Sequence, residues 1–370
     1  MILGFEITLV LYLFAAAIFW AIKPYSFNGA LVSLIAVNLI ALFVADFFIL
    51  AFIAFQINLI LALYAATIAA PRRFQSIIPW FAFVGLIPLN LDVPLGRGIT
   101  LQPLYEELGN VRLPVLWWIG GTFLVVKSFV MLRESLKHRR FRLLPVFAGL
   151  TFLPSYSAGP IHGIEPYLEK NVRPKVTRSD LLQAFLQIGW GGAAFYVIAP
   201  ALRRTISPAP DDIIELAWGV YTSLGALFFD FSGYTLMAIA MAKLFGITLP
   251  DNFNKPYLAV SIQDFWQRWH ISLSRFIATY IFKPFVRNYG MPRLAIFVAF
   301  VCAGLWHKFS LGYFLWGVGH GAALSLAMKP PAAWVAYSSK WPPHVSTGVT
   351  WFATMTWVAS LSYLATRMPI

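Results

Sequence analysis

Hydrophobic and polar positions follow one another along this chain in long blocks. Apolar runs that are long enough to cross a bilayer, about 20 residues each, recur from one end to the other, and short polar stretches separate them. The first run, residues 2–22, lacks the basic start and small-residue cleavage site of a signal peptide, so we expect a retained first span. The pattern predicts an all-α polytopic membrane protein with about ten membrane segments.

The next apolar block, residues 29–70, predicts two tilted crossings joined in a helical hairpin. Lys23 and the pair Arg72 and Arg73 flank it, whereas its middle has no basic residue. The positive-inside bias therefore places both flanks in the cytoplasm and the amino terminus outside.

Two further crossings, at residues 77–91 and 113–132, bring the chain back to the basic run 133–142 on the cytoplasmic side. Pro154, Gly159 and Pro160 then interrupt an apolar run, which favours a re-entrant segment buried in protein. The later candidate spans are residues 181–202, 213–245 (long enough to bend back on itself), 294–306, 311–328 and 349–364.

We expect a single integral membrane domain over residues 1–370. It would consist of amino-terminal spans in residues 1–142, a core with re-entrant and interfacial helices in residues 143–328, and a loop with the last span in residues 329–370. No internal repeat is visible, which disfavours a transporter built from inverted halves.

Composition agrees with this class of protein. Of the 370 residues, 59% are hydrophobic and 12% charged, which is too apolar for an ordinary soluble domain. The net charge of +13 falls in short clusters between apolar runs, so it indicates membrane topology and no nucleic-acid surface. A single cysteine, Cys302, excludes an internal disulfide and a multi-cysteine metal site, and we expect no metal.

Residues 251–280 are the stretch that carries candidate chemistry. This run is dense in aromatic and charged residues and too polar to cross lipid freely, so it should lie at the interface or dip in against other helices. If it is helical around Trp266, then Trp266, His270 and Ser274 share one face, and Phe265 and Trp269 share a neighbouring one. That pattern would place a histidine inside an aromatic-lined cavity.

Two more histidines follow the next apolar runs. His307 ends one of them, and His320 lies in the following one. The 13 residues between them would point the two side chains in different directions on an uninterrupted helix. For His320 the alternative is close helix packing through Gly317, Gly319 and Gly321.

Six sequence blocks occur in order: FLPSYSAGPI (152–161), FDFSGY (229–234), LPDNFNKPYL (249–258), DFWQRWHISLS (264–274), GLWHK (304–308) and WGVGHG (316–321). Together they resemble the membrane-bound O-acyltransferase family, in its bacterial branch of alginate O-acetylation and teichoic acid D-alanylation proteins. The resemblance implies a ring of helices around a thin central reaction chamber, with a funnel from each face. It also implies that His307 is the essential histidine and His270 its partner.

The chain departs from the family pattern at two places. Lys308 stands where the family has glycine, and ATYIFKPFVRN at residues 278–288 replaces the alginate-type extension. The second departure leads us away from alginate-type acetylation, with D-alanyl or acetyl transfer favoured.

Acyl transfer from a thioester to a hydroxyl requires a base, and neutral imidazole suits that role. We therefore predict His307 as general base, with His270 donating a hydrogen bond to the carbonyl oxygen. The candidate substrate-binding residues are Trp266, Trp269, Ser274, Asn254 and Trp306, with His320 and Asp230 as further candidates.

No bound cofactor is expected. The resemblance implies an acyl thioester donor, on an acyl carrier protein or coenzyme A at the cytoplasmic face, and a small membrane or periplasmic relay protein as partner. The expected location is the bacterial inner membrane, and the acceptor would be a hydroxyl of an extracytoplasmic glycan, lipid or relay protein.

The alternative is a transporter or flippase for an acylated or anionic metabolite, in which Asp46 and Lys127 would bind an ion or proton.

Structural roles are the alternative for several polar residues. Asp230 would be a hydrogen-bond hub, and Asp264 and Arg268 an i to i+4 pair that fixes an interfacial helix. His138, His162 and His344 would be solvated surface residues, because they lie in polar or proline-rich loops.

Overall fold

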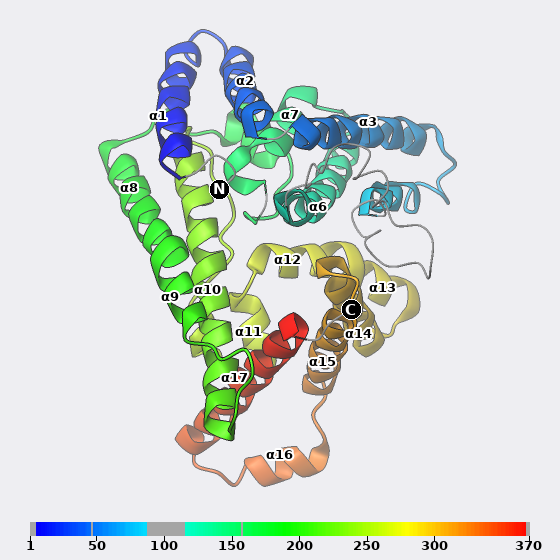
Figure 1. Cartoon of the computed structure of the whole chain (residues 1–370). Coiled ribbons are helices and arrows are strands. Elements are labelled where there is room, and N and C mark those ends of the chain that lie inside the picture. The colour runs from blue at the N-terminus through cyan, green and yellow to red at the C-terminus, as the bar shows by residue number, and fades with distance from the viewer. Residues whose placement is uncertain (1–4, 46, 87–114, 157, 368–370) are drawn as a thin grey trace, which may run out of the picture. The chain divides into compact units, whose positions relative to one another are not determined.

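The computed structural model describes residues 5–45, 47–86, 115–156 and 158–367 (Figure 1). Across these ranges the chain forms α-helices joined by loops and by short 3₁₀ and π-helical turns. Strands are absent from the described ranges, where one isolated bridge pairs Phe253 with Trp269. The predicted all-α fold is confirmed.

The chain divides into two compact units, which we describe separately. Unit 1 comprises Met1–Gly189 and Thr235–Pro250, and unit 2 comprises Trp190–Tyr234 and Asp251–Ile370. The divide falls within two helices, α8 (Arg178–Ala193) and α10 (Ile213–Lys243). The expected partition into residues 1–142, 143–328 and 329–370 stays a prediction, as does the ring of helices.

Unit 1 begins with the predicted first span and hairpin. Helix α1 (Phe5–Ile22) is followed by α2 (Phe27–Ala45) and α3 (Phe47–Ala69), so two helices are present where two crossings are expected over residues 29–70. Further described elements before residue 178 are a 3₁₀ helix (Ile78–Leu86), α6 (Val115–Lys137), α7 (Leu143–Thr151) and three one-turn 3₁₀ helices (Leu153–Ser155, Glu165–Tyr167 and Glu169–Asn171). Pro79 lies in the 3₁₀ helix and has no backbone N–H to donate to an α-helical turn. Residues 87–91 of the crossing predicted at 77–91 lie outside the described residues.

A buried amide joins the first helices of unit 1. The side-chain oxygen of Asn38 on α2 accepts hydrogen bonds from the hydroxyl of Tyr12 on α1 and, over 3.0 Å, from the backbone N–H of Leu153. Asn38 is fully buried, and its N–H₂ group donates to the carbonyl oxygen of Leu34 over 2.7 Å. Because a buried polar group without partners would cost free energy, this network specifies how α1 and α2 pack.

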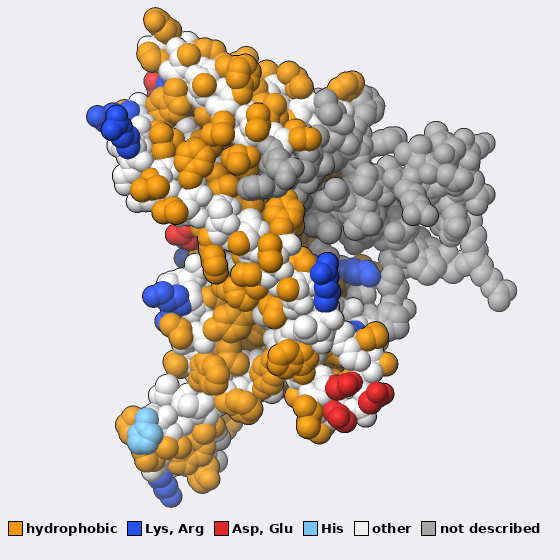
Figure 2. Space-filling view, turned by 60° about the vertical axis from the view of Figure 1, so that its left-hand side comes forward, with side chains coloured by type: hydrophobic (Ala, Val, Ile, Leu, Met, Phe, Trp, Pro, Cys, Tyr) orange, Lys and Arg blue, Asp and Glu red, His pale blue; other side chains and the backbone are white. Residues whose placement is uncertain are grey.

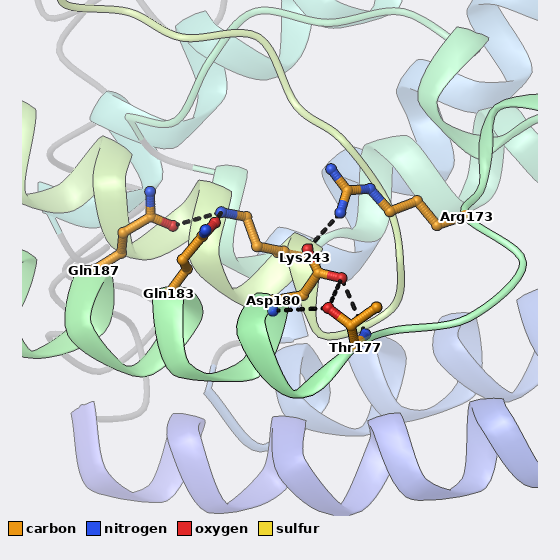
Figure 3. A network of polar contacts seen from close by, with 6 residues as sticks. All are labelled: Arg173, Thr177, Asp180, Gln183, Gln187 and Lys243. Atoms are coloured by element: carbon orange, nitrogen blue, oxygen red, sulfur yellow. Dashed lines mark hydrogen bonds and ion pairs between the residues drawn. The ribbon is translucent and has the colours of Figure 1, made fainter.

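Helix α8 (Arg178–Ala193) starts at a reciprocal cap (Figure 3). The Thr177 hydroxyl accepts the backbone N–H of Asp180 over 3.1 Å, and the Asp180 carboxylate accepts the N–H of Thr177 over 3.0 Å. Arg173 pairs with the same carboxylate. Lys243, the last residue of α10, donates to the side-chain oxygen of Gln187 over 3.0 Å. This end of α8 is therefore held by charged and amide groups.

A single candidate span continues from α8 through residue 204. A π-helical turn (Ala194–Ile198) joins α8 to α9 (Ala199–Arg204). Pro200 has no N–H to donate to the preceding turn, and the π-helical turn lies directly before it. The span predicted at residues 181–202 is thus present with a local change of helical pitch.

The prediction that residues 213–245 bend back on themselves is wrong. They form one helix, α10 (Ile213–Lys243), of 31 residues. No proline interrupts this sequence, so nothing removes a backbone hydrogen bond inside the helix. At 1.5 Å per residue α10 is about 46 Å long, which exceeds the roughly 30 Å hydrocarbon core of a bilayer.

The rest of unit 2, from residue 251 onward, contains the helices that carry His270, His307 and His320 or lie next to them in the sequence. Three short elements follow residue 260: α11 (Ile262–Arg268), α12 (Ile271–Phe276) and, after a π-helical turn (Ile277–Phe282), α13 (Lys283–Tyr289). Longer helices complete the unit: α14 (Pro292–His307), α15 (Leu311–Ala327), α16 (Ala332–Ser338) and α17 (Pro343–Arg367).

Helices α14 and α15 pack closely through glycines. A methyl group at Gly317 would lie 2.6 Å from the carbonyl oxygen of Phe300, and one at Gly321 would lie 2.9 Å from that of Phe297. Gly319 faces Leu361 of α17 instead, at 2.7 Å from the position of an added methyl group. The predicted packing role of these glycines is confirmed.

Apolar side chains cover much of the visible surface (Figure 2). On α8, for example, Leu182, Leu186 and Trp190 recur at helical spacing and are 58–64% exposed. By length and composition three helical segments of the described ranges can cross a membrane, namely Phe52–Ala69, Arg178–Arg204 and Ile213–Lys243. The protein is thus a multi-pass membrane protein, while the count of about ten segments stays a prediction.

Candidate functional site

A cavity of about 150 Å³ lies within unit 2 and is bordered by three histidines, His270, His307 and His320. We call it the histidine chamber. Its other lining residues are Leu227, Phe231, Phe265, Trp266, Trp269, Tyr313, Trp316, Val358, Ser362, Ala365 and Thr366. They come from α10, α11, α15 and α17, except Trp269, which follows the end of α11, and most are apolar or aromatic. Such a wall excludes water and strengthens polar interactions inside the cavity.

His270 lies at a break between two helices. The expectation of one helix through Trp266, His270 and Ser274 is wrong, because α11 ends at Arg268 and α12 begins at Ile271. The backbone of His270 is left-handed, with φ of +44°, which is uncommon for a residue other than glycine. The break turns the buried imidazole toward the chamber, where the ring of Phe231 packs edge-on at 4.7 Å.

The loop before α11 fixes this break, and its role was missed from the sequence. The side-chain oxygen of Asn252 accepts a hydrogen bond from the Ser272 hydroxyl over 2.6 Å, and its backbone carbonyl accepts one from the N–H of Ile271 over 3.0 Å. Asn252 is 1% exposed. These bonds hold the residues after His270, so Asn252 positions the histidine without lining the chamber. The sequence signal for Asn252 was its place in the block at residues 249–258, where it is one of several polar side chains.

Three of the predicted substrate-binding residues lie outside the chamber lining. Ser274 donates its hydroxyl to the carbonyl oxygen of Trp266 over 2.8 Å, because the helix break moves it off the expected face. Asn254 is exposed, and its backbone N–H donates to the carbonyl oxygen of Arg268 over 2.9 Å. Trp306 is buried against the His307 ring at 4.6 Å. Trp266 and Trp269 do line the chamber.

His307 is the last residue of α14. The helix stops there because Lys308 adopts an extended backbone, and Ser310 then caps α15 by accepting the N–H of Tyr313 over 3.4 Å. The His307 ring lies 5.5 Å from that of Trp316 and 5.8 Å from that of Tyr313. The imidazole is thereby presented to the chamber from a helix end.

His320 also borders the chamber, from the middle of α15. Residues 308–310 separate α14 from α15, so His307 and His320 lie on different helices. Their directions are therefore not set by the 13-residue spacing along one helix. The indole N–H of Trp266 donates to Nδ1 of His320 over 3.3 Å. Trp316, one turn earlier on α15, packs against the same imidazole at 4.7 Å.

Two carboxylates of this region have structural contacts. Asp230, a further candidate site residue, accepts from the Arg203 guanidinium over 2.6 Å and does not line the chamber. Asp264 pairs with Arg268 over 2.6 Å, as the i to i+4 spacing predicts. Both observations agree with the structural interpretation of these residues.

The remaining histidines differ from one another. His344 is exposed, as predicted. His162 is 4% exposed, so its predicted surface position is wrong. Its Nε2 atom and the Ser155 hydroxyl share a hydrogen bond of 3.0 Å, and its ring packs against the ring of Tyr167. His138 is half-buried and donates to the Glu165 carboxylate over 2.8 Å, so it is not simply solvated.

Lys127 and Asp46 are the two ionisable residues of the transporter alternative. Lys127 on α6 is fully buried, and its ammonium group donates to the hydroxyl and carbonyl oxygens of Ser155 over 3.1 and 3.3 Å. It is therefore paired with polar neighbours. Asp46 lies outside the described residues.

Fold and chamber together define a class: an all-α membrane protein with histidines in an aromatic-lined cavity. Residues 194–359 match the model of the MBOAT, membrane-bound O-acyltransferase family, and this range contains all three chamber histidines. Over the matched region the chain is similar to that family, and the resemblance inferred from the sequence is confirmed.

Individual relatives agree with this assignment. A peptidoglycan O-acetyltransferase from Helicobacter pylori is 39% identical over 137 residues, which are 36% of this chain and 26% of the relative. A teichoic acid D-alanyltransferase from Bacillus subtilis is 28% identical over 228 residues, 55% of this chain and 56% of the relative. A probable alginate O-acetylase from Pseudomonas fluorescens is 37% identical over 279 residues, 70% of this chain and 52% of the relative. The chain thus spans about half, or less, of the length of these curated relatives.

Proposed function

We propose that this protein is a membrane-bound O-acyltransferase that moves a small acyl group from a thioester to a hydroxyl group. The observation that carries the proposal is the histidine chamber, in which His270, His307 and His320 border one cavity with aromatic walls. The relatives named for O-acetyl and D-alanyl transfer support the same reaction class.

His307 acts as the general base. As the acceptor oxygen attacks the thioester carbonyl carbon, its proton passes to the imidazole of His307, and a C–O bond forms. The C–S bond then breaks, and the leaving thiolate takes the proton from the imidazolium. The products are an ester and a free thiol, so the step needs neither an oxidant nor a metal ion.

The other two histidines stabilise the carbonyl oxygen as it gains negative charge. Because Nδ1 of His320 accepts the indole N–H of Trp266, the proton of its neutral ring lies on Nε2. His320 can thus serve as a hydrogen-bond donor, whereas it lacks the free lone pair at Nδ1 that a base would use. His270 supplies a second donor, as the sequence predicts.

The size of the chamber favours a short acyl group. A cavity of about 150 Å³ in another protein accommodates benzene, which has six non-hydrogen atoms. The histidine chamber has a volume of about 150 Å³, so an acetyl or D-alanyl group fits inside it. A long fatty acyl chain would need space beyond these walls.

For the donor and partners we propose those that the family resemblance implies. The donor is a thioester of an acyl carrier protein or coenzyme A on the cytoplasmic face, and the acceptor hydroxyl lies on an extracytoplasmic glycan, lipid or relay protein. A small membrane or periplasmic relay protein completes the transfer where the final acceptor is a polymer. The location is the bacterial inner membrane.

Acyl transfer by the purified protein in liposomes tests the proposal. Labelled acetyl, D-alanyl and palmitoyl thioesters are offered to wild type, His307→Ala and the control His344→Ala, whose histidine is exposed. We expect wild type and the control to consume a short-chain thioester, and His307→Ala to lose at least 100-fold in rate. Equal rates for His307→Ala and wild type would contradict the base, and preference for palmitoyl would contradict the size argument.

A further inference from the structure

A second cavity, of about 420 Å³, adjoins the histidine chamber within unit 2. The two cavities share three lining residues, Leu227, Ser362 and Thr366. The second cavity is also lined by Arg203, Ile206, Pro208, Ser223, Ala226 and Arg367. We call it the arginine vestibule, because it brings two guanidinium groups to the side of the chamber.

We propose that the arginine vestibule binds the phosphate or carboxylate of an acidic acceptor, whose neighbouring hydroxyl group enters the histidine chamber. This inference rests on the proposed acyltransferase function and names the chemical class of its acceptor.

The charge of the vestibule favours an anion. Among the lining residues that the structure describes are two guanidinium groups and no carboxylate. The Asp230 carboxylate accepts a hydrogen bond from the Arg203 guanidinium over 2.6 Å. One carboxylate beside two guanidinium groups leaves the vestibule with a net positive charge. Guanidinium groups match the geometry of phosphate and carboxylate oxygens and bind them with two parallel hydrogen bonds.

Arg367 is held in place before any ligand binds. Its two terminal nitrogens donate to the carbonyl oxygens of Pro208 and Ser207 over 2.5 and 2.7 Å. Its guanidinium also lies over the ring of Tyr363, 4.9 Å from the centroid. A guanidinium group has five N–H donors, so these contacts orient the group and leave donors for an anion. Such preorganisation lowers the entropy cost of binding.

The hydroxyl groups between the arginines and the histidines suit a polyol. Ser362 and Thr366 border both cavities, and Ser223 lines the vestibule. Ser362 and Thr366 lie one helical turn apart on α17, so they form a short polar path along one face of that helix. An acceptor with an acid group and a nearby hydroxyl could contact both ends of this path.

Membrane topology assigns the vestibule to the acceptor side. The loop before α8 contains Arg173, which pairs through its carbonyl oxygen with Lys23, on the side that the positive-inside bias assigns to the cytoplasm. Residues Arg178–Arg204 form one candidate span, so the Arg203 end faces the other side. A thioester donor arrives from the cytoplasm, and the vestibule therefore receives the acceptor.

Matched pairs of small acceptors test the site in the full-length protein in liposomes, with an acetyl thioester as donor. Glycerol 3-phosphate is compared with glycerol, and galacturonic acid with galactose. The variants are Arg367→Gln, Arg367→Lys and the control Arg204→Gln, whose arginine is exposed at the end of α9 and does not line the vestibule.

We expect wild type and Arg204→Gln to prefer the acidic member of each pair. Arg367→Gln should lose roughly 10- to 100-fold of that preference, mainly in KM, because hydrogen bonds to a charged ligand are lost. Arg367→Lys should keep part of it. Transfer without any preference would overturn the vestibule assignment while the acyltransferase function stands.

Two further measurements, a comparison of donors and an equilibrium binding assay, distinguish the other possible results. If Arg367→Gln instead impairs the use of acetyl-phosphopantetheine relative to acetyl-pantetheine, the anion belongs to the donor and the acceptor assignment is wrong. If wild type transfers no acyl group, the proposed function fails, and equilibrium binding of labelled glycerol 3-phosphate decides the site: binding that Arg367→Gln abolishes supports it, and equal or absent binding overturns it.

Discussion

The indole N–H of Trp266 donates to Nδ1 of His320 across the wall of the histidine chamber, over 3.3 Å. The two residues are 54 positions apart in the sequence, on α11 and α15. Because this bond selects the ring tautomer with its proton on Nε2, it couples the position of α11 to the hydrogen-bonding capacity of a histidine on another helix.

Replacing Trp266 with phenylalanine should weaken catalysis without removing the aromatic wall. The variant loses the N–H that fixes the His320 tautomer, and we expect kcat to fall about tenfold, with a smaller change in KM for the thioester. Steady-state kinetics measure the change. Trp351→Phe is the matched control, because the Trp351 indole donates to the carbonyl oxygen of Tyr257 over 2.7 Å, away from the chamber. Equal kcat values for the two variants would refute a role for the tautomer.

The glycine contact between α14 and α15 should be sensitive to a single methyl group. In Gly317→Ala the new carbon would lie 2.6 Å from the Phe300 carbonyl oxygen, so the helices that carry His307 and His320 must separate. We expect a loss of about 1–3 kcal/mol in the free energy of unfolding. In Gly348→Ala the added methyl group meets nothing within 4 Å, and alanine favours the helix by about 0.5–1 kcal/mol. Thermal unfolding in detergent compares them; equal midpoints would contradict the close packing.

Buried Lys127 should prove structural. Lys127→Met keeps the length of the side chain but removes the ammonium group that donates to Ser155, leaving buried oxygens with fewer donors. We expect a cost of about 1–3 kcal/mol in stability, with acyl transfer per folded molecule unchanged, because Lys127 does not line the chamber. A transporter would show the reverse order: transport lost in Lys127→Met and retained in His307→Gln.

Glu165 should contribute a pH-dependent part of the stability. Burial raises the pKa of its carboxyl group, but hydrogen bonds from His138 and Asn171 outweigh burial and hold the pKa below the ordinary 4.5. A carboxyl whose pKa is lowered on folding stabilises the protein above its unfolded pKa and loses that contribution as the pH falls through its folded pKa. Between about pH 5 and pH 3 the unfolding temperature of wild type should therefore drop more steeply than that of Glu165→Gln.

The control for this titration is Glu169→Gln, because Glu169 is an exposed carboxylate in the same loop. We expect its unfolding temperature to follow that of wild type across the same range of pH. Parallel curves for wild type and Glu165→Gln would mean that the His138 contact adds nothing to stability.

Long apolar blocks made most of the helices predictable. The hairpin of α2 and α3 follows from an apolar run too long for one crossing, and α14 and α15 lie close to their expected bounds. Length alone misled at α10, where a run without proline stays one helix although it exceeds the bilayer thickness.

Local spacing predicted the site less well than it predicted the spans. The family motifs led to His270 and His307, and both line the chamber. Helical periodicity wrongly added Ser274, since it assumes a helix that the left-handed backbone of His270 interrupts. His162 looked solvated because the loop that follows it is rich in charged residues. Contacts with Ser155 and Tyr167, which periodicity does not encode, bury it.

Chemical rescue tests the central claim, that His307 is the base, most directly. In His307→Ala the truncated side chain leaves space at the end of α14, beside the chamber, and added imidazole can occupy it. We expect the variant to be inactive with a short-chain thioester, and we expect transfer to rise with the concentration of neutral imidazole. A variant as active as wild type without imidazole would contradict the assignment of His307 as the base.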